Sequence, residues 1–295
     1  MPDAKYDTNV ASKGNLFPEV LVKEMFNLVQ GHSALAKLAG GIPLAFNGNE
    51  IMTFQMEGEV NLVGENELKT SKKIVLDPVK IVPLKVEYGA RISDEFNYAT
   101  EEAQLDILRA WSEGFAKKLA RALDIMAIHG VNPRTGTAAT AIGTNSFDTN
   151  TGVTTITYVA GSEEDKLEDA IAAIGDYENS GFAFSPAFAA ALGKVKVNGV
   201  PQYPEFKLGG RPDYFNGVPC DVNSTVGTAD SAVVGDFANA FKWGYAKQIP
   251  LEIIPYGDPD QTGHDLRAYN QIYLRGEAYL GWGILDPAAF ARIDA

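Results

Sequence analysis

Residues 100–130 read TEEAQLDILRAWSEGFAKKLARALDIMAIHG and hold the clearest periodic pattern in the chain. Large or small apolar residues recur every three or four positions, which places them on one face of a helix. These residues are Leu108, Trp111, Phe115, Leu119, Ala122 and Met126, whereas Lys117, Lys118, Arg121 and Asp124 fall outside the stripe. Thr100 suits the N-cap and Gly130 suits the position after the last turn. The pattern predicts a helix over 100–129, about 45 Å long at roughly 1.5 Å per residue, which suits an element that crosses a flattened molecule.

A polar interruption divides the strand-like region that precedes this helix. Strand-like residues occupy 51–55, 60–63 and 74–90, and the segment 64–73, GENELKTSKK, is almost entirely polar. A long hairpin with a polar tip explains the pattern, and such a tip has too few apolar groups to pack against its own domain. We therefore expect the hairpin to project from the body unless a partner covers it. The charged residues of the tip are Glu65, Glu67, Lys69, Lys72 and Lys73.

The three lysines of the tip allow two interpretations. They belong either to a solvated hairpin end or to a surface that docks on acidic residues of a neighbouring subunit, where complementary charges set the register. A catalytic lysine is not expected, because nothing in the segment would remove its ammonium group from water.

Both helices and strands are expected after the long helix. Residues 1–20, which come before the first expected helix, are a weakly patterned polar arm. Ser162 and Asp165 have the spacing of a capping box. The remaining expected elements are a short helix near 20–29, a strand at 153–159, a helix after Ser162, a strand at 181–184, a helix at 187–195, a loop-like stretch at 197–220, strands at 232–234 and 249–254, and closing strands at 266–275, 278–280 and 288–293.

Composition excludes several classes of protein. With 295 residues, the chain fits one large domain or two modest ones, and its 45% hydrophobic fraction excludes a disordered or fibrous chain. The formal net charge of −13 argues against a broad basic surface for nucleic acid. No apolar run approaches the roughly 20 residues that span a bilayer, and the first residues carry no secretory signal. A soluble cytoplasmic protein is the resulting expectation.

The search for catalytic and cofactor motifs is negative. The sequence has no phosphate-binding loop, no nucleophile elbow and no zinc-protease helix. His32, His129 and His264 are isolated and have no metal-ligand spacing, so structural roles are expected. Cys220 is a single cysteine without a nearby histidine, which favours a buried cysteine on a strand over a nucleophile. We therefore predict no catalytic residue, no cofactor and no metal.

Two acidic features have ordinary explanations. Residues 258–263, DPDQTG, begin like a calcium-binding loop, but Tyr269 stands where the twelfth position requires a bidentate glutamate. An acidic surface turn is the expected structure. Asp106 and Glu113 on the long helix are explained as parts of a solvated face rather than as an acid–base pair.

The order of elements resembles the tailed-phage major capsid protein family with the HK97 fold. An arm, a long polar-tipped hairpin, a long helix, a mixed α/β segment and closing strands occur in that order over nearly the whole chain. The stretches that carry the resemblance are ARISDEF at 90–96, DIMAIHG at 124–130, SGFAFSP at 180–186, NGVP at 198–201, FNGVP at 215–219, GDF at 235–237 and LDPAAF at 285–290.

The resemblance implies an α+β chain with five regions. These are an N-terminal arm with short helices at 1–49, an extended β-hairpin (E-loop) at 50–85, a P-domain at 86–154 that contains the spine helix 100–129, a mixed α/β A-domain at 155–254, and closing P-domain strands at 255–295. The implied function is that of a major capsid protein, which assembles into pentamers and hexamers of an icosahedral shell around phage DNA. The tip residues and the stripe of the long helix are then the candidate assembly residues.

The resemblance also implies partners and a location. The expected partners are copies of the same chain, a portal, and packaged DNA enclosed without sequence-specific binding; no membrane is involved. About 45 residues precede the hairpin, too few for an attached scaffolding segment, so a separate scaffolding protein is expected. Lys69, Lys72 and Lys73 match the lysine that some members use for cross-linking, but the loop 256–265 has no asparagine, which argues against a cross-link. The expected location is the virion capsid, assembled in the host cytoplasm.

Two alternatives remain open at the level of sequence. An encapsulin-type compartment shares the fold but encloses protein cargo. An α/β enzyme with a site in 155–254 would show a deep pocket with a strongly perturbed titratable group.

Overall fold

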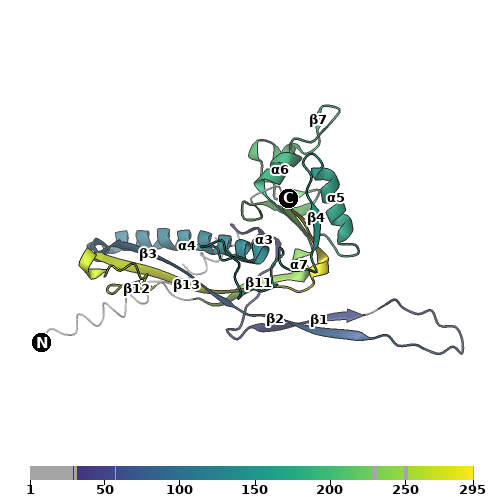
Figure 1. The fold of residues 1–295 in the computed structure, drawn as a ribbon, viewed down its shortest axis with the longest axis horizontal. Helices are drawn as coiled ribbons and strands as arrows, with labels where there is room; N and C mark the ends of the chain where they lie inside the picture. Colours follow the sequence, from purple (N-terminus) through teal and green to yellow (C-terminus); the bar gives the residue numbers. More distant parts are fainter. Residues whose placement is uncertain (1–28, 30–31, 57, 228–230, 249–251, 295) are drawn as a thin grey trace.

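The computed structural model describes residues 29, 32–56, 58–227, 231–248 and 252–294. Figure 1 shows three parts: a long helix lying on a sheet, a second sheet with helices rising from one end of it, and a hairpin that extends away from both. The arm and the short helix expected at 1–28 lie outside the described residues. The first described helix is α3 (Ala34–Leu38), whose N-cap is Ser33.

The expected long helix is present as α4 (Glu101–His129). It lies along a sheet made of β3 (Leu84–Ser93), β11 (Phe241–Gln248), β12 (Glu252–Ile254) and β13 (Gln271–Ile284). The long strand β13 is central: β3 pairs with one edge, and β11 and β12 pair with the other. Gly276 faces Trp111, and a Cβ there would lie 2.3 Å from the indole ring, so glycine allows the helix to approach the sheet.

The predicted stripe forms the contact between this helix and the sheet. Leu108, Phe115, Leu119 and Met126 are buried, and Trp111 is half-buried with its ring 5.1 Å from that of Phe115. The prediction for Asp124 was wrong. The sequence placed this residue outside the buried stripe, but the structure buries its side chain fully. The reason is that α3 and the loop around Thr225 also contact this side of α4, so the buried surface is wider than one stripe.

The closing strands differ from the prediction at their start. Residues 267–269 form a 3₁₀ turn, η3 (Arg267–Tyr269), rather than a strand. Asp265 Oδ1 accepts hydrogen bonds from the N–H groups of Arg267 (2.9 Å) and Ala268 (3.3 Å), which stabilises the turn. Beyond it, β13 runs unbroken to Ile284, where the sequence predicted two separate pieces.

The second part contains a six-stranded sheet in the order β4-β14-β10-β5-β9-β8. Its bounds are β4 (Thr154–Thr157), β14 (Phe290–Asp294), β10 (Ala232–Gly235), β5 (Gly181–Phe184), β9 (Val218–Val222) and β8 (Tyr214–Phe215). Strands β8 and β9 occupy a stretch that the sequence predicted as a loop. Helices α5 (Glu163–Ala173) and α6 (Pro186–Leu192) belong to this part, and an aromatic core fills it. Its rings include Phe182, Phe184, Phe188, Phe206 and Phe215.

The predicted capping box at the start of α5 is wrong. Ser162 makes no side-chain capping bond. Its hydroxyl donates instead to the carbonyl of Val159 at 2.7 Å, while the carboxylate of Glu163 accepts from Gly161 N at 2.9 Å. The turn before the helix therefore competes for the groups that a capping box would use. The smaller elements are η1 (Asp94–Tyr98), β6 (Lys196–Val197), β7 (Val200–Pro201), η2 (Pro204–Gly209), α7 (Phe237–Ala240) and η4 (Pro287–Ala289).

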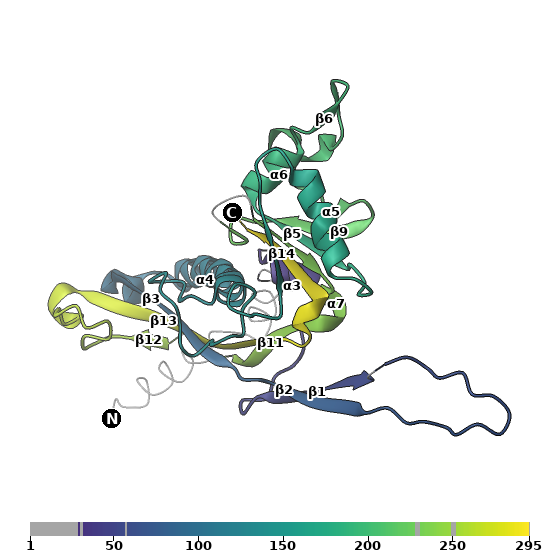
Figure 2. The ribbon, with the colours of Figure 1, turned by 45° about the vertical axis from the view of Figure 1, so that its right-hand side comes forward.

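The hairpin consists of β1 (Asn49–Met56) and β2 (Ile74–Ile81), joined by a long loop. Figures 1 and 2 show that it leaves the body at its base and that its far end contacts no other part of the ribbon. At the base, Ile81 is fully buried. A Cβ at Gly283 would lie 2.8 Å from the Ile81 side chain, so the glycine at this position of β13 allows the base of the hairpin to pack closely against the sheet. The strand expected at 60–63 is absent, and Val60 and Leu62 are each 95% exposed. Because no neighbouring segment covers these side chains, the apolar alternation of the sequence does not lead to strand pairing here.

Candidate assembly surfaces

One face of the projecting hairpin is apolar and uncovered. Phe54 lies directly opposite Leu76, and Met52 lies opposite Pro78 on the same side of the ladder. Met52, Phe54, Ile74 and Leu76 are each more than half exposed. An isolated two-stranded ribbon is marginal in water, and four large apolar groups on one side of it are typical of a surface that another protein covers.

The tip of the hairpin has the exposure that the sequence predicted. Glu65, Glu67, Lys69, Lys72 and Lys73 are all exposed. None of them forms an ion pair within the described residues. Their charges are therefore not neutralised by the chain itself.

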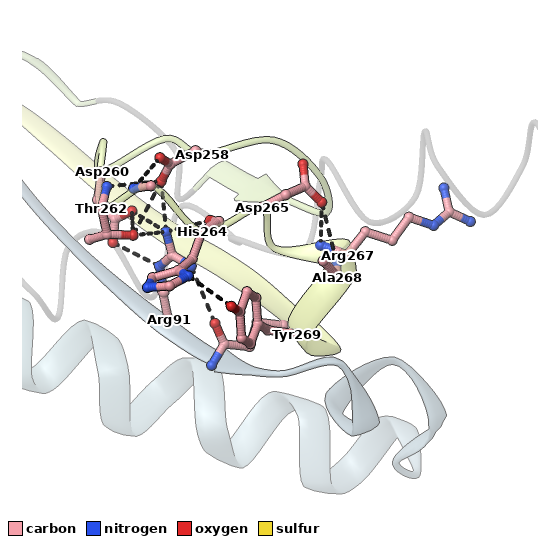
Figure 3. Close-up of polar contacts among 11 residues, drawn as sticks. Arg91, Asp258, Asp260, Thr262, His264, Asp265, Arg267, Ala268 and Tyr269 are labelled. Carbon is pink, nitrogen blue, oxygen red and sulfur yellow. Dashed lines mark hydrogen bonds and ion pairs between the residues drawn. The ribbon is translucent and has the colours of Figure 1, made fainter.

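An arginine organises the loop at the opposite end of the sheet (Figure 3). Arg91 on β3 donates from Nε to Asp260 Oδ2 (2.8 Å) and from Nη2 to Asp258 Oδ1 (2.8 Å). The same guanidinium donates to Thr262 Oγ1 (2.6 Å) and to the carbonyl of His264 (3.0 Å). The hydrogen bond and charge of Arg91 hold the pKa of Asp260 well below its usual range.

This loop is the stretch that resembles a calcium site, and the predicted acidic turn is confirmed. The guanidinium lies among the oxygens where a cation would lie, because Arg presents several N–H donors in a fixed planar array. Within the residues that the structure describes, no group of three or more His, Cys, Asp or Glu side chains is arranged to hold a metal ion.

Asp124 joins three segments from a fully buried position. Its Oδ1 accepts hydrogen bonds from Ser33 Oγ (2.5 Å) and Leu35 N (3.2 Å). Its Oδ2 accepts from Ala34 N (2.9 Å) and Thr225 Oγ1 (2.6 Å). Burial raises the pKa of Asp124 to about 6, even though the four hydrogen bonds act to lower it. The carboxylate thus connects the start of α3, the C-terminal part of α4 and the loop that follows β9.

His129, the last residue of α4, lies in a second junction, which links this helix to the six-stranded sheet. Its Nδ1 is 2.7 Å from Asp148 Oδ2, and its Nε2 is 3.0 Å from the carbonyl oxygen of Thr225. Asp148 also accepts from Arg292 Nη1 of β14 at 2.6 Å. Both ring nitrogens face oxygen acceptors, and only the doubly protonated imidazolium can donate to both.

The other sequence candidates take the structural places expected of them. Cys220 is buried in β9, and burial raises the pKa of its thiol to about 11, which keeps it unreactive. Asp106 and Glu113 are exposed on α4. Among the described residues, no helix is both long and apolar enough to cross a membrane.

Comparison with known proteins identifies the family. The sequence model of the phage capsid family matches residues 13–295. This chain belongs to the phage capsid family. A capsid protein explains why the chain carries an uncovered apolar hairpin.

Solved structures resemble the capsid protein over most of its length. A chain of Mycobacterium phage Ogopogo has a TM-score of 0.74 and 30% sequence identity, covering 89% of this chain and 91% of its own. A chain of Gordonia phage Cozz has a TM-score of 0.71 and 26% identity, covering 88% and 85%. The capsid of an empty GTA particle has a TM-score of 0.63 at 17% identity, covering 89% of each chain, and therefore shows the shared fold alone. Comparison with curated proteins gave no significant match.

Sequence reasoning missed the two polar junctions of the capsid protein and the partner of the acidic loop. An isolated Asp within an otherwise apolar run, LDIMAI at 123–128, is the signal that marks Asp124. Arg91 lies in a strand with ordinary alternation, so nothing near it in sequence marks its role. The structure therefore brings together residues that the chain separates widely, whereas the predicted tip and stripe lie in different places and do not meet.

The junction at His129 should make the stability of the capsid protein depend on pH. Burial lowers the pKa of His129, but the hydrogen bond and charge of Asp148 outweigh it, and the folded-state pKa is raised. The stabilisation is therefore fully present below the unfolded value of about 6.5 and is lost as the pH rises through the raised folded value. In urea unfolding of unassembled subunits, the difference between wild type and His129→Gln should shrink over that window.

The matched control is His32→Gln, which removes an exposed histidine whose side chain makes no hydrogen bond within the described residues. A difference between wild type and His129→Gln that stays constant with pH would contradict the charged junction.

Proposed function

We propose that this chain is the tile of an icosahedral phage shell and that its copies join through the hairpin. In this proposal, residues 50–85 act as the E-loop, α4 is the spine helix of a P-domain at 86–154 with closing strands at 255–295, and 155–254 is the A-domain. A patch on one subunit meets a different patch on the next, and such heterologous contacts close into pentamers and hexamers when the rotation allows.

The observation that carries the proposal is the apolar face around Phe54 and Leu76. A hairpin with this face uncovered is costly for a solitary protein, because it exposes contiguous apolar surface to water. The same face, laid across a neighbouring subunit, adds contact area that a compact body does not offer. Large shared interfaces suit a shell that contains DNA under pressure and gains no strength from disulfides in a reducing cytoplasm.

A second exposed surface supports contacts between copies at the far end of the second part. Val197 and Val200, in the hairpin of β6 and β7 at that end (Figures 1 and 2), are more than half exposed, and Leu208 of η2 is fully exposed with a φ of 56°. A leucine held in the left-handed region is unusual, and such backbone strain persists at functional positions. This end is the region proposed to meet its equivalents around the centre of each capsomer.

The remaining expectations belong to the same proposal. A separate scaffolding protein and a portal would act with the shell, which would assemble in the host cytoplasm. The net charge of −13 suits a container that encloses DNA without binding it tightly.

The proposal predicts that the purified protein, alone or with a co-expressed scaffold, forms megadalton particles or rings of five and six subunits. Light scattering measures the mass, and negative-stain electron microscopy shows the symmetry. Recovery of only monomers and small dimers under every assembly condition tested would refute it.

A further inference from the structure

An apolar groove lies between α4 and β3 on the helix side of the sheet. Its volume is about 250 Å³. Val86 on β3 forms one wall, and Phe115, Leu119 and Ile125 on α4 form the other. Such a recess has room for one or two large apolar side chains, and the hairpin of the same chain leaves the body on another side (Figures 1 and 2).

The rim of this groove is basic, although the chain as a whole is acidic. Lys118, Arg121 and Arg134 lie around the apolar walls, against a single acidic residue, Glu87. Lys118 and Arg134 are exposed and form no ion pair within the described part of the chain. Arg121 donates to the hydroxyl of Ser224 at 3.1 Å and also forms no ion pair within the described residues. The chain carries 38 acidic and 25 basic residues, so three cations with one acid around a recess reverse the overall balance.

We propose that this groove binds an acidic segment of a separate protein, with large apolar side chains inserted between the helix and the strand. The apolar walls require such side chains, and the unneutralised rim selects Asp and Glu beside them. DNA fits less well, because its phosphates would meet few cations and its bases would gain little from a narrow apolar recess. The chain's own hairpin tip fits less well because its three lysines, Lys69, Lys72 and Lys73, outnumber its two glutamates and would approach the basic rim.

This inference goes beyond the shell proposal, because the groove belongs to one subunit and is available before assembly. If the protein forms shells but its groove binds no acidic segment, the shell proposal stands and the groove proposal is wrong. If the monomer binds the acidic segment but never forms particles, the groove proposal stands and the shell proposal is wrong.

The test is selection of short random peptides displayed on yeast against the full-length protein, followed by titration of the enriched clones. Enriched sequences should combine Asp or Glu with Leu, Phe, Trp or Met and should be depleted of Lys and Arg. The double variant Lys118→Glu/Arg134→Glu should weaken their binding about tenfold or more. The matched control Lys117→Glu/Lys196→Glu makes the same change in net charge at exposed lysines outside the groove, and it should bind as the wild type does.

Each other outcome overturns the proposal. Failure to enrich any sequence, or enrichment of clones that bind both double variants equally, would show that the groove is not the site. Enrichment of sequences that match a stretch of this chain would assign the groove to a second copy. Displacement of the peptides by duplex DNA, with DNA binding lost in the rim variant alone, would assign it to nucleic acid.

Discussion

Deletion of residues 62–73 should abolish particle formation and leave a folded, unassembled subunit. The segment is exposed except at the partly buried Val63, and its far end contacts no other described element, so its loss removes little from the body. The interface that it helps to form should lose its outermost contacts and its complementary charges. Sedimentation analysis and electron microscopy of wild type and deletion, prepared side by side, measure the effect.

A further double variant shows which part of the hairpin matters. Phe54→Ser/Leu76→Ser keeps the loop but removes the apolar face, and it should also prevent assembly. Circular dichroism and thermal unfolding should match the wild-type subunit in all cases, which separates failed assembly from failed folding. Unchanged particles from the deletion would remove the hairpin from the assembly proposal.

Asp124→Ala should destabilise the subunit by about 3–5 kcal/mol, one of the largest effects expected of any single substitution. The alanine leaves four buried donors without an acceptor, from Ser33, Ala34, Leu35 and Thr225. Urea unfolding in the hairpin-deleted background, where assembly does not interfere, measures the loss. Asp106→Ala on the exposed side of the same helix is the control and should change stability by less than about 0.5 kcal/mol.

The pH dependence of this site has a definite sign. Because burial raises the folded-state pKa of Asp124 to about 6, the native state binds its proton more readily than the unfolded state does. The contribution of Asp124 to stability should therefore increase as the pH falls from about 6 towards about 4. A loss below about 1 kcal/mol for Asp124→Ala at neutral pH would contradict the structural role.

Features that are periodic or local were predictable from the sequence. The apolar stripe of α4 repeats over many turns, so its position and its buried face followed from spacing, and the polar run at 64–73 marked the end of the hairpin. The prediction of a strand at 60–63 was wrong because alternation alone does not form a strand when no neighbour covers either face. The capping box failed because the turn before α5 binds the groups that it requires.

Contacts between distant residues were not predictable. Asp124 and Ser33 are separated by 91 positions, and Arg91 and Asp258 by 167. No sequence pattern marks either pair, because the two residues of each pair come together only in the folded tertiary structure. The charges of the hairpin tip were predictable as exposed, but what they contact is a property of more than one chain.

Arg91 has a consequence for how the acidic loop keeps its shape. Guanidinium stays protonated at every pH that a virion meets, and it is covalently part of the polypeptide. A loop held by a bound ion would soften whenever chelators or dilution removed that ion. This corner of the subunit carries its own permanent counter-ion, so its conformation is independent of the mineral content of the host or of the surroundings into which the particle is released.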